Sequence, residues 1–409
     1  MRNLLFIIFI ATFVNTVQAQ VGALIWEEPF DTLDTEIWNI QIGDGCPDLC
    51  YWGNGEMQYY KEENVYTDSI PGEPGNKGLV IEARKERAPN GGRFTSGRLN
   101  TQDQVEIRYG VIEIRMMVPD LETGLWPAAW LLGANNPEVG WPQSGEIDMM
   151  EMGHSLDERT NQGHPDSNVN SYVGSNAIWY ASSACSDGNP TCAAAIAYDT
   201  QYNQPYSADL DMNDRFVTYR LYWDPNSLRF TITDRRTEYD LYTSPLSISS
   251  GDLANTFRKP FFVLLNMAVG GNFTDASVST EVTAPFPAKM YVDYIKVFSW
   301  NGEGEVTVNG ELVSKEFEAT SPSSIQLNQN YPNPFNPETV IGYQLESPAN
   351  VRVRVFDALG REVSELVNAK RSAGYHEVRF NAANLPSGLY YYRLETGSFV
   401  QTRKMMLIK

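Results

Sequence analysis

The sequence predicts an all-β protein in which a large sandwich or jelly roll is followed by a small β domain. The chain of 409 residues contains 31 glycines, 23 prolines and 22 tyrosines, a composition that favours strands joined by many turns. Short apolar or alternating runs follow one another from Leu24 to about Trp300, and long stretches at helical period are hard to find. Beyond residue 301 the composition changes and a second, compact unit begins.

The strands predicted in the large domain are bounded by turn residues and alternate between apolar and other side chains. In "YGVIEIRMMVP" (109–119), Ile112, Ile114 and Met116 share one face, which is the pattern of a half-buried strand. Further strands are predicted at 78–84, 216–225, 228–234 and 291–298. Strands at this spacing over roughly 280 residues indicate a large sandwich or jelly roll.

The first residues, "MRNLLFIIFIATFVNTVQAQ", have the three parts of a secretory signal peptide. Arg2 provides the positive start, 4–14 form the apolar segment, and Val17-Gln18-Ala19 resembles a cleavage site. We therefore expect residues 1–19 to be a signal peptide of an exported protein. No other stretch is long and apolar enough to span a bilayer.

Charge limits the class of partner. The formal net charge is −20 and the pI is about 4.6, whereas binding to nucleic acid requires a basic surface. A neutral substrate fits this balance better.

Four cysteines lie in two close pairs, Cys46 with Cys50 and Cys185 with Cys192. In an exported chain we favour two local disulfides that staple loops. Zinc is the alternative, but the spacings are not C-x2-C and no nearby histidine completes a tetrahedral set. The sequence alone leaves the pairing open.

Residues 301–323 are polar and acidic and end in Ser and Pro, so we predict a linker there, after a domain spanning 20–300. Residues 324–409 then form a compact unit with hairpin signals such as "DALGRE" and "LPSGLY". From 320 to 409 there are ten Lys and Arg against seven Asp and Glu, a net charge of +3. The acidity therefore belongs to the first domain and the linker, which supports the boundary.

The chain lacks the motifs of several common hydrolases. It has three histidines, and it contains no H-E-x-x-H, no G-x-S-x-G and no P-loop. What remains is "WPQSGEIDMMEMGH" (141–154), which places Glu146, Asp148 and Glu151 within six residues. A pair of carboxylates is the chemistry that glycoside hydrolysis needs, since one attacks the anomeric carbon and a protonated one donates to the leaving oxygen.

The spacing of these acids is irregular for a strand. Glu146 and Asp148 share a face, but regular alternation would point Glu151 to the opposite side. One extra residue at Met149-Met150, forming a β-bulge, would turn Glu151 back, and bulges are over-represented beside active sites.

An acidic strand face is more often merely solvated, and tryptophan is more often core filler. Here, however, Trp126, Trp130 and Trp141 lie within sixteen residues just before the acids. Because aromatic rings stack on the apolar faces of sugars, this grouping favours a sugar-binding cleft.

Together, "YGVIEIRMMVPDLETGLWPAAWLLGANNPEVGWPQSGEIDMMEMGH" closely resembles the core of family-sixteen glycoside hydrolases, in the bacterial laminarinase branch with its E-I-D-x-x-E motif. The likeness extends from "WEEPFDTLDTEIWNI" through "GNGEMQYY" and "SGRLNT" to "FFVLLNMAVGGNF" and "MYVDYIKVF". It implies a curved, concanavalin-like β-sandwich jelly roll with a cleft across its concave face.

The resemblance also implies roles for individual residues. Glu146 matches the nucleophile, Asp148 the assisting acid and Glu151 the general acid/base of a retaining mechanism that needs no cofactor. The positions that match sugar contacts are Asn54, Arg98, Trp126 and Trp130, and Trp141 joins them as a cleft residue. Many relatives hold a structural Ca²⁺, for which Glu28 and Asp293 lie in the matching segments; Asp293 can equally be an ordinary strand-end acid.

The sequence departs from the family pattern after the motif. Laminarinases usually carry a histidine-containing strand resembling "VHGTLHW", whereas this chain has "NVNSYVGSNAIWYASSAC" and then the second cysteine pair. Trp179 is a candidate for an equivalent cleft position, and the exact glucan stays open between laminarin and mixed-linkage glucan.

The tail, with "LNQNYPNPFNPETVIGYQL" and "LPSGLYYYRLETG", resembles the C-terminal sorting domain of the type IX secretion system. This implies a small β-sandwich that addresses the protein, through the periplasm, to the medium or the cell surface. A carbohydrate-binding module is the alternative, but no tryptophan follows Trp300 to form a stacking platform.

The sequence therefore predicts an exported endo-1,3-β-glucanase acting by double displacement on a polysaccharide. The alternatives are hydrolysis or transglycosylation of another polysaccharide, such as agar or carrageenan, on the same fold. A glucan-binding lectin is the non-enzymatic alternative, and the three acids count against it.

Overall fold

A computed structural model describes residues 21–198, 207–208, 211–313, 325–327, 330, 333–346, 348–371, 374–397 and 399–409. These residues form two β units, and each unit has its own hydrophobic core. The prediction of an all-β sandwich with a small C-terminal β unit is confirmed. The predicted signal peptide, residues 1–19, lies outside the described residues.

The larger unit contains two extended sheets. The outer sheet has eleven strands, eight of them in the order β16-β15-β14-β9-β19-β5-β6-β3, while β1 pairs with β19, β4 with β5 and β17 with β15. In chain order these strands are β1 (Val21–Glu28), β3 (Gln58–Tyr60), β4 (Val65–Ser69), β5 (Lys77–Lys85), β6 (Phe94–Ser96), β9 (Gly110–Met117), β14 (Val217–Asp224), β15 (Ser227–Asp234), β16 (Thr237–Asp240), β17 (Leu246–Ser247) and β19 (Ala288–Trp300).

The inner sheet has ten strands, eight of them in the order β13-β12-β11-β10-β18-β8-β20-β21, while β7 pairs with β18 and with β2. Its strands are β2 (Asn39–Ile40), β7 (Arg98–Asn100), β8 (Val105–Arg108), β10 (Leu125–Gly133), β11 (Glu146–Glu151), β12 (Gly174–Tyr180), β13 (Ala193–Ala195), β18 (Phe261–Val269), β20 (Glu305–Val308) and β21 (Glu311–Leu312).

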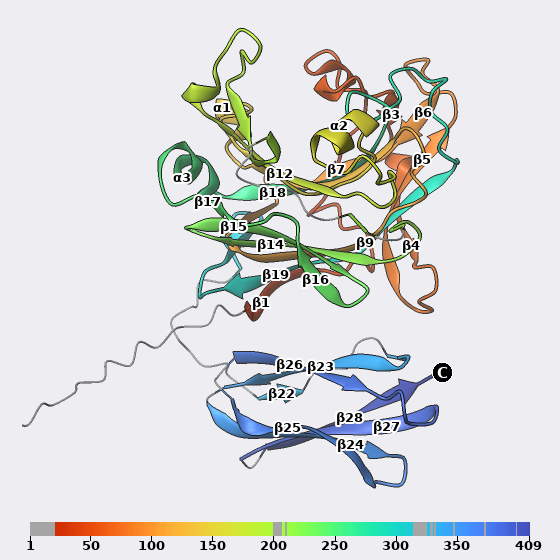
Figure 1. The fold of residues 1–409 in the computed structure, drawn as a ribbon, viewed down its shortest axis with the longest axis vertical. Coiled ribbons are helices and arrows are strands. Elements are labelled where there is room, and N and C mark those ends of the chain that lie inside the picture. Colours follow the sequence, from red (N-terminus) through yellow and green to blue (C-terminus); the bar gives the residue numbers. More distant parts are fainter. Residues whose placement is uncertain are drawn as a thin grey trace, which may run out of the picture.

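Helices are short and lie in the connections between strands. Figure 1 shows the two sheets as stacked layers, with α1 and α2 on the side of the inner sheet that faces away from the outer sheet. The helices are α1 (Asn136–Val139), α2 (Leu156–Asn161) and α3 (Gly251–Phe257), with 3₁₀ turns η1 (Cys50–Gly53), η2 (Glu62–Asn64), η3 (Ser182–Ala184) and η4 (Ile196–Tyr198).

The main core lies between the two sheets, and the side chains of β10 alternate between this core and the opposite face of the inner sheet. Leu125, Ala129 and Leu131 are fully buried in this core. Trp126 and Trp130 occupy the intervening positions, so they project from the opposite face of the inner sheet. One face of the sheet therefore stabilises the fold, and the other is free to carry a site.

The smaller unit is a two-sheet sandwich with strand orders β22-β23-β26 and β25-β24-β27-β28. Its core includes Tyr343, Val353 and Tyr392, which are almost completely buried. Its strands are β22 (Gln326–Leu327), β23 (Glu338–Leu345), β24 (Ala349–Asp357), β25 (Glu362–Arg371), β26 (Gly374–Asn381), β27 (Gly388–Thr396) and β28 (Phe399–Leu407).

The structure corrects the start of the predicted linker. Residues 305–312, which were expected in the linker 301–323, form the hairpin β20–β21 on the edge strand β8. Val306 enters the main core, and the turn residues Asn309 and Gly310 both have positive φ. Asn-Gly between two alternating segments is a strong hairpin signal, so the sequence contained the information. The larger unit therefore continues to about residue 313.

Both predicted disulfides are present, Cys46 with Cys50 and Cys185 with Cys192. The first ends at Cys50, where η1 begins, and the second closes the loop between β12 and β13. Each closes a short loop between strands, so the prediction is confirmed and zinc is not needed to explain the spacing.

Within the described ranges, no helix has the length and apolar character needed to cross a membrane.

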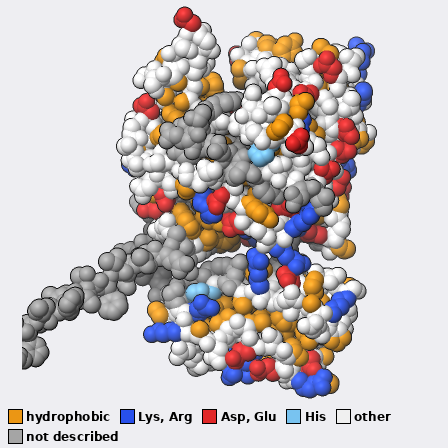
Figure 2. All heavy atoms as spheres, viewed as in Figure 1, with side chains coloured by type: hydrophobic (Ala, Val, Ile, Leu, Met, Phe, Trp, Pro, Cys, Tyr) orange, Lys and Arg blue, Asp and Glu red, His pale blue; other side chains and the backbone are white. Residues whose placement is uncertain are grey.

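On the visible face of the larger unit, acidic side chains are scattered instead of forming one patch (Figure 2).

Candidate active site

Strand β11 carries the three acids on the face of the inner sheet that points away from the core. From Asp148 to Glu151, β11 advances three residues while β12 advances only two, from Asn176 to Gly174. On the other side, Ala129 pairs with Met150 and Trp130 with Asp148, so Met149 has no partner on β10. The predicted β-bulge is therefore confirmed.

The bulge places two consecutive methionines in the core. Met149 is 2% exposed and Met150 is fully buried, together with Ile147. Because the bulge absorbs one residue, Glu151 returns to the face of Glu146 and Asp148 instead of entering the core. The local sequence thus groups three carboxylates that regular alternation would separate.

Strand β10 supplies the neighbours of the general acid candidate. The Trp126 indole Nε1 donates a hydrogen bond to Glu151 Oε1 at 3.0 Å. Its ring lies parallel to the Phe273 ring, with the centroids 4.2 Å apart. Trp126 is therefore fixed by stacking on one side while it holds the carboxylate of Glu151.

Burial and mutual repulsion separate the protonation behaviour of the three acids. Burial raises the pKa of Glu151 to about 8, and the charge of Glu146 adds to this rise. Burial also raises the pKa of Glu146 to about 7, but the Arg98 charge and a hydrogen bond from Trp141 oppose it. Arg98 thus favours the ionised form of Glu146, whereas the charge of Glu146 favours the protonated form of Glu151, which is the division that a nucleophile and a general acid need.

Asp148 lies between them and is the most difficult to ionise. Its pKa is raised well above the usual range, first by burial and then by the charges of Glu146 and Glu151. A protonated carboxyl group can donate a hydrogen bond to an ionised neighbour. This arrangement allows Asp148 to orient and stabilise an ionised Glu146.

The predicted sugar-contact residues surround this strand. The Arg98 guanidinium lies 5.1 Å from the centroid of the Trp130 ring, and Trp130 Nε1 donates to Asn266 Oδ1 at 2.8 Å. Trp141 is 44% exposed and donates to Glu146. Asn54 is exposed and joins the group through Glu56, with 3.3 Å between Nδ2 and Oε1. The structure therefore brings all five predicted residues into the neighbourhood of β11.

Sequence reasoning missed several residues of the same group. Glu56, Gln58 and Tyr60 line one face of "GEMQYY", at the period of a strand, and this alternation could have identified them. Asn266 is the single polar residue in the apolar strand β18, which is also a usable signal. Trp52 and Phe273 gave no signal, because only the folded chain brings them to Arg98 and Trp126.

Trp179 does not lie in the cleft, contrary to the sequence-based expectation. It packs against the main core and makes an edge contact with Phe257, with the ring centroids 6.3 Å apart. Its neighbours in β12 face the acids instead, since Asn176 pairs with Asp148 and Ile178 with Glu146. The alternation of the strand decides this, and it makes the strip beside Glu146 partly apolar.

The predicted calcium ligands do not fit a metal site. The Glu28 carboxylate accepts hydrogen bonds from Phe30 N and Trp38 Nε1, each at 3.0 Å. Asp293 is engaged by Arg115 and by Asn76 Nδ2 at 2.9 Å. In the part of the chain that the structure describes, no three His, Cys, Asp or Glu residues are grouped closely enough to hold a metal ion. Both carboxylates are thus satisfied by protein donors.

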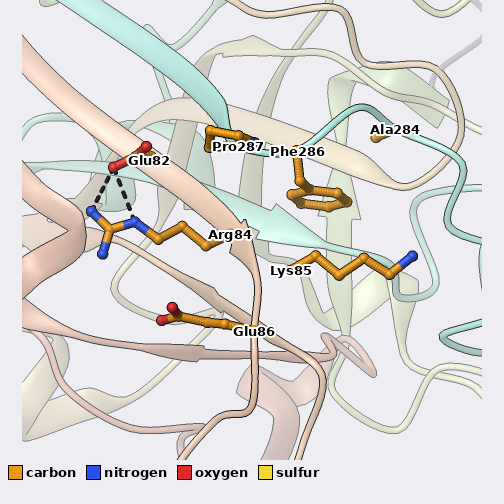
Figure 3. A pocket seen from close by; sticks show the side chains of 7 residues that line it. All are labelled: Glu82, Arg84, Lys85, Glu86, Ala284, Phe286 and Pro287. Carbon is orange, nitrogen blue, oxygen red and sulfur yellow. Dashed lines mark hydrogen bonds and ion pairs between the residues drawn. The ribbon is translucent and has the colours of Figure 1, made fainter.

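A separate surface depression of about 520 Å³ is lined by Glu82, Arg84, Lys85, Glu86, Ala284, Phe286 and Pro287. Figure 3 shows the Arg84 guanidinium paired with Glu82, and Glu86 lies 3.5 Å from Lys61 Nζ. Each carboxylate in this wall has its own cation, so none is positioned to act as a proton donor. The candidate catalytic acids are therefore those of β11 and not those of this depression.

The hydrogen bond between Trp126 and Glu151 predicts a measurable pH effect. Replacing Trp126 by phenylalanine removes a donor that favours the ionised carboxylate, so the pKa of Glu151 should rise. The alkaline limb of kcat/KM should then move upward by about one pH unit. Trp130→Phe is the matched control, because its indole donates to Asn266 and not to an acid. Equal shifts in both variants would contradict this assignment.

Comparisons with known proteins agree with this geometry. Residues 53–281 match the family model described as "XgeA-like, catalytic GH16 domain", and 329–409 match "Secretion system C-terminal sorting domain". Clotting factor G alpha subunit of Tachypleus tridentatus is 31% identical over 67% of this chain, which spans only 34% of that relative. Beta-glucanase of Rhodothermus marinus is 29% identical over 68% of this chain and 85% of its own length.

Among solved structures, the laminarinase catalytic domain of Thermotoga maritima is 32% identical, with a TM-score of 0.51. The match covers 68% of this chain and 99% of that domain. The bulged E-I-D-x-x-E strand and both family matches thus lead to one conclusion: the chain belongs to family sixteen of the glycoside hydrolases and ends in a type IX secretion sorting domain.

Proposed function

We propose that this protein is an exported retaining endo-glycosidase that hydrolyses 1,3-β-glucan. The observation that carries the proposal is the grouping of Glu146, Asp148 and Glu151 on one face by the bulge, where Arg98 favours an ionised Glu146 and the charge of Glu146 favours a protonated Glu151. Retaining glycosidases need one ionised and one protonated carboxyl group at such a site.

In the first step the ionised Glu146 attacks the anomeric carbon. The bond to the leaving oxygen breaks, and Glu151 gives its proton to that oxygen, so a glycosyl ester on Glu146 and a shortened chain result. Asp148, which lies between the two in β11, orients Glu146 and adjusts its charge. No group outside these side chains is required for the step.

In the second step the ionised Glu151 takes a proton from water, and the water oxygen attacks the same anomeric carbon. The ester bond breaks, Glu146 is released as a carboxylate, and Glu151 is again protonated. Two inversions at one carbon give net retention of configuration.

The surrounding residues supply sugar binding. We assign Trp126, Trp130 and Trp141 to stacking or edge contacts with glucosyl rings, and Arg98 and Asn54 to hydroxyl groups. Arg98 is half-buried between two tryptophan rings, so its planar donors have a fixed direction. A neutral polysaccharide also agrees with the net charge of −20, because an anionic chain would be repelled.

Product analysis tests the substrate. The purified protein should release oligosaccharides of intermediate length from laminarin and retain the β-configuration in the first product. Lichenan, agarose and carrageenan serve as comparison substrates. Release from lichenan alone would change the linkage to mixed 1,3-1,4-β-glucan, and release from agarose or carrageenan alone would overturn the glucan proposal.

We also propose the route and the domain limits. A signal peptide over 1–19 directs the chain to the periplasm, and the tail, from about 324 to 409, addresses the type IX machinery, in agreement with the family match at 329–409. The catalytic unit then spans residues 20 to about 313, since β20 and β21 belong to its inner sheet. The mature protein is secreted or attached to the cell surface.

A further inference from the structure

A fourth carboxylate lies in the site and has no part in the two steps above. Glu56 is 2% exposed, although it lies only two residues from the exposed Asn54. Its Oε2 accepts hydrogen bonds from Gln58 Nε2 at 2.6 Å and from Tyr60 Oη at 3.0 Å. A buried carboxylate with this many donors is held in one orientation, and burying it is costly unless a positive charge is near.

The positive charge near Glu56 is Arg98. Burial raises the pKa of the Glu56 carboxyl, and the Arg98 charge is the largest effect that opposes this rise. Arg98 is likewise the largest effect that opposes the rise in the pKa of Glu146. One guanidinium therefore favours the ionised form of both carboxylates.

Arg98 is also held mechanically. Its Nε donates to Gln41 Oε1 at 2.5 Å, and its guanidinium carbon lies 4.3 Å from the centroid of the Trp52 ring. Trp130 covers it at 5.1 Å, and Trp130 is tied through Asn266 to Tyr60, whose hydroxyl group donates to Glu56. Glu56 thus acts on Arg98 by its charge, and a chain of hydrogen bonds links Glu56 to Trp130, whose ring covers Arg98.

The backbone beside Arg98, at Tyr51 and Trp52, is conformationally strained. Tyr51 and Trp52 both have left-handed backbone conformations, with φ of 56° and 51°. Such conformations are unfavourable for bulky residues and persist only where the surroundings determine them, as they do at functional sites. Two contacts fix this loop: the disulfide between Cys46 and Cys50, and the hydrogen bond that Tyr51 N donates to Asp44 O.

We infer that Glu56 is a positioning residue that holds Arg98 away from a tight ion pair with Glu146, and thereby keeps the nucleophile reactive. The inference rests on the proposed function. The charge of Arg98 acts on Glu56, Tyr60 and Glu146, and Asp148 and Glu151 follow Glu146 in β11. Without the charge of Glu56, Glu146 would be the remaining carboxylate neighbour of Arg98 and would pair with it more closely.

The test is Glu56→Gln, which removes the charge and keeps the size. An opposite charge nearby favours the ionised form of Glu146, so the acidic limb of kcat/KM should move to lower pH. A more closely paired carboxylate is also a weaker nucleophile, so kcat on a dinitrophenyl β-laminaribioside, which needs no general acid, should fall about tenfold. Glu56→Asp keeps the charge and should retain the acidic limb of the unaltered protein.

Glu113→Gln is the matched control for burial. Glu113 is a 9%-exposed carboxylate in β9 of the outer sheet, and it accepts hydrogen bonds from Arg220 and Tyr294. It should lower Tm as Glu56→Gln does, but leave the pH profile unchanged. If both variants lose stability and neither shifts the acidic limb or the dinitrophenyl rate, Glu56 is only structural and the inference fails.

A second measurement needs no activity. Titration of the Glu146 carboxyl group by ¹³C NMR, identified by its loss in Glu146→Gln, should show a lower pKa in Glu56→Gln than in the unaltered protein. An unchanged pKa overturns the inference. A shifted pKa in a protein that cleaves none of the four polysaccharides would instead overturn the proposed function and leave the role of Glu56 standing.

Discussion

Glu146→Ala is expected to reduce kcat on laminarin by at least about 10⁴-fold, because no side chain is then placed to form the glycosyl ester. The change removes a half-buried carboxylate from the surface of the inner sheet, so the core beneath β11 stays intact and Tm should change little. Initial rates and a thermal melt on the same preparation measure both effects. Glu36→Ala, which removes an exposed carboxylate, is the control for general effects of losing an acid.

Chemical rescue separates this role from simple damage. With sodium azide and a dinitrophenyl β-laminaribioside, the anion should enter the space that the Glu146 side chain leaves and attack the anomeric carbon once. A single displacement inverts the configuration, so the product should be the α-glycosyl azide, identified by NMR. A variant that keeps more than a tenth of the normal rate, or that forms only the β-azide, would remove Glu146 from the nucleophile role.

Glu151→Gln is expected to lower kcat/KM on laminarin by about 10³-fold, the usual size of a general acid contribution. Burial and the Glu146 charge raise the pKa of Glu151 to about 8, so in the unaltered protein kcat/KM should fall as the pH passes that value and the acid loses its proton. In Glu151→Gln this alkaline limb should disappear, because no proton is left to titrate. Rates from pH 5 to 10 on laminarin measure the change.

The leaving group and azide again provide the contrast. A dinitrophenyl leaving group needs no proton, so the first step should survive in Glu151→Gln. Azide should then accelerate the second step, in which the glycosyl ester on Glu146 is broken. Because the ester on Glu146 still forms, the product should be the β-glycosyl azide, opposite to the product of Glu146→Ala. Equal losses on laminarin and on the activated substrate would show that Glu151 is not the acid.

Much of the fold could be predicted from the sequence because its signals are local. Alternation in "YGVIEIRMMVP" placed Ile112 and Ile114 in a core, and both are fully buried. The irregular spacing of Glu151 predicted a bulge, which the pairing of β11 with β12 confirms. The predicted linker start at residue 301 was wrong. The polar composition of this segment indicates a linker, but the Asn-Gly turn at 309–310 is an equally local signal and forms a hairpin.

Long-range features could not be predicted in the same way. Trp179 belongs to a strand whose two faces are not distinguished by its sequence, and only the folded structure shows that it packs against the core and Phe257. Asp293 is engaged by Asn76 and Arg115 from distant parts of the chain, and Glu28 accepts a hydrogen bond from Trp38, ten residues further on. Nothing in the neighbouring sequence reveals those hydrogen bonds.

The sequence by itself determined the strand pattern and the three acids with their bulge, because each depends on residues close together in the chain. The tertiary structure decided which acid loses its proton first. That order depends on burial and on Arg98, which reaches Glu146 from a distant segment, and on Glu56, which acts on Arg98 from another. Electrostatic energies depend on distance in space, and only the folded sheet sets those distances.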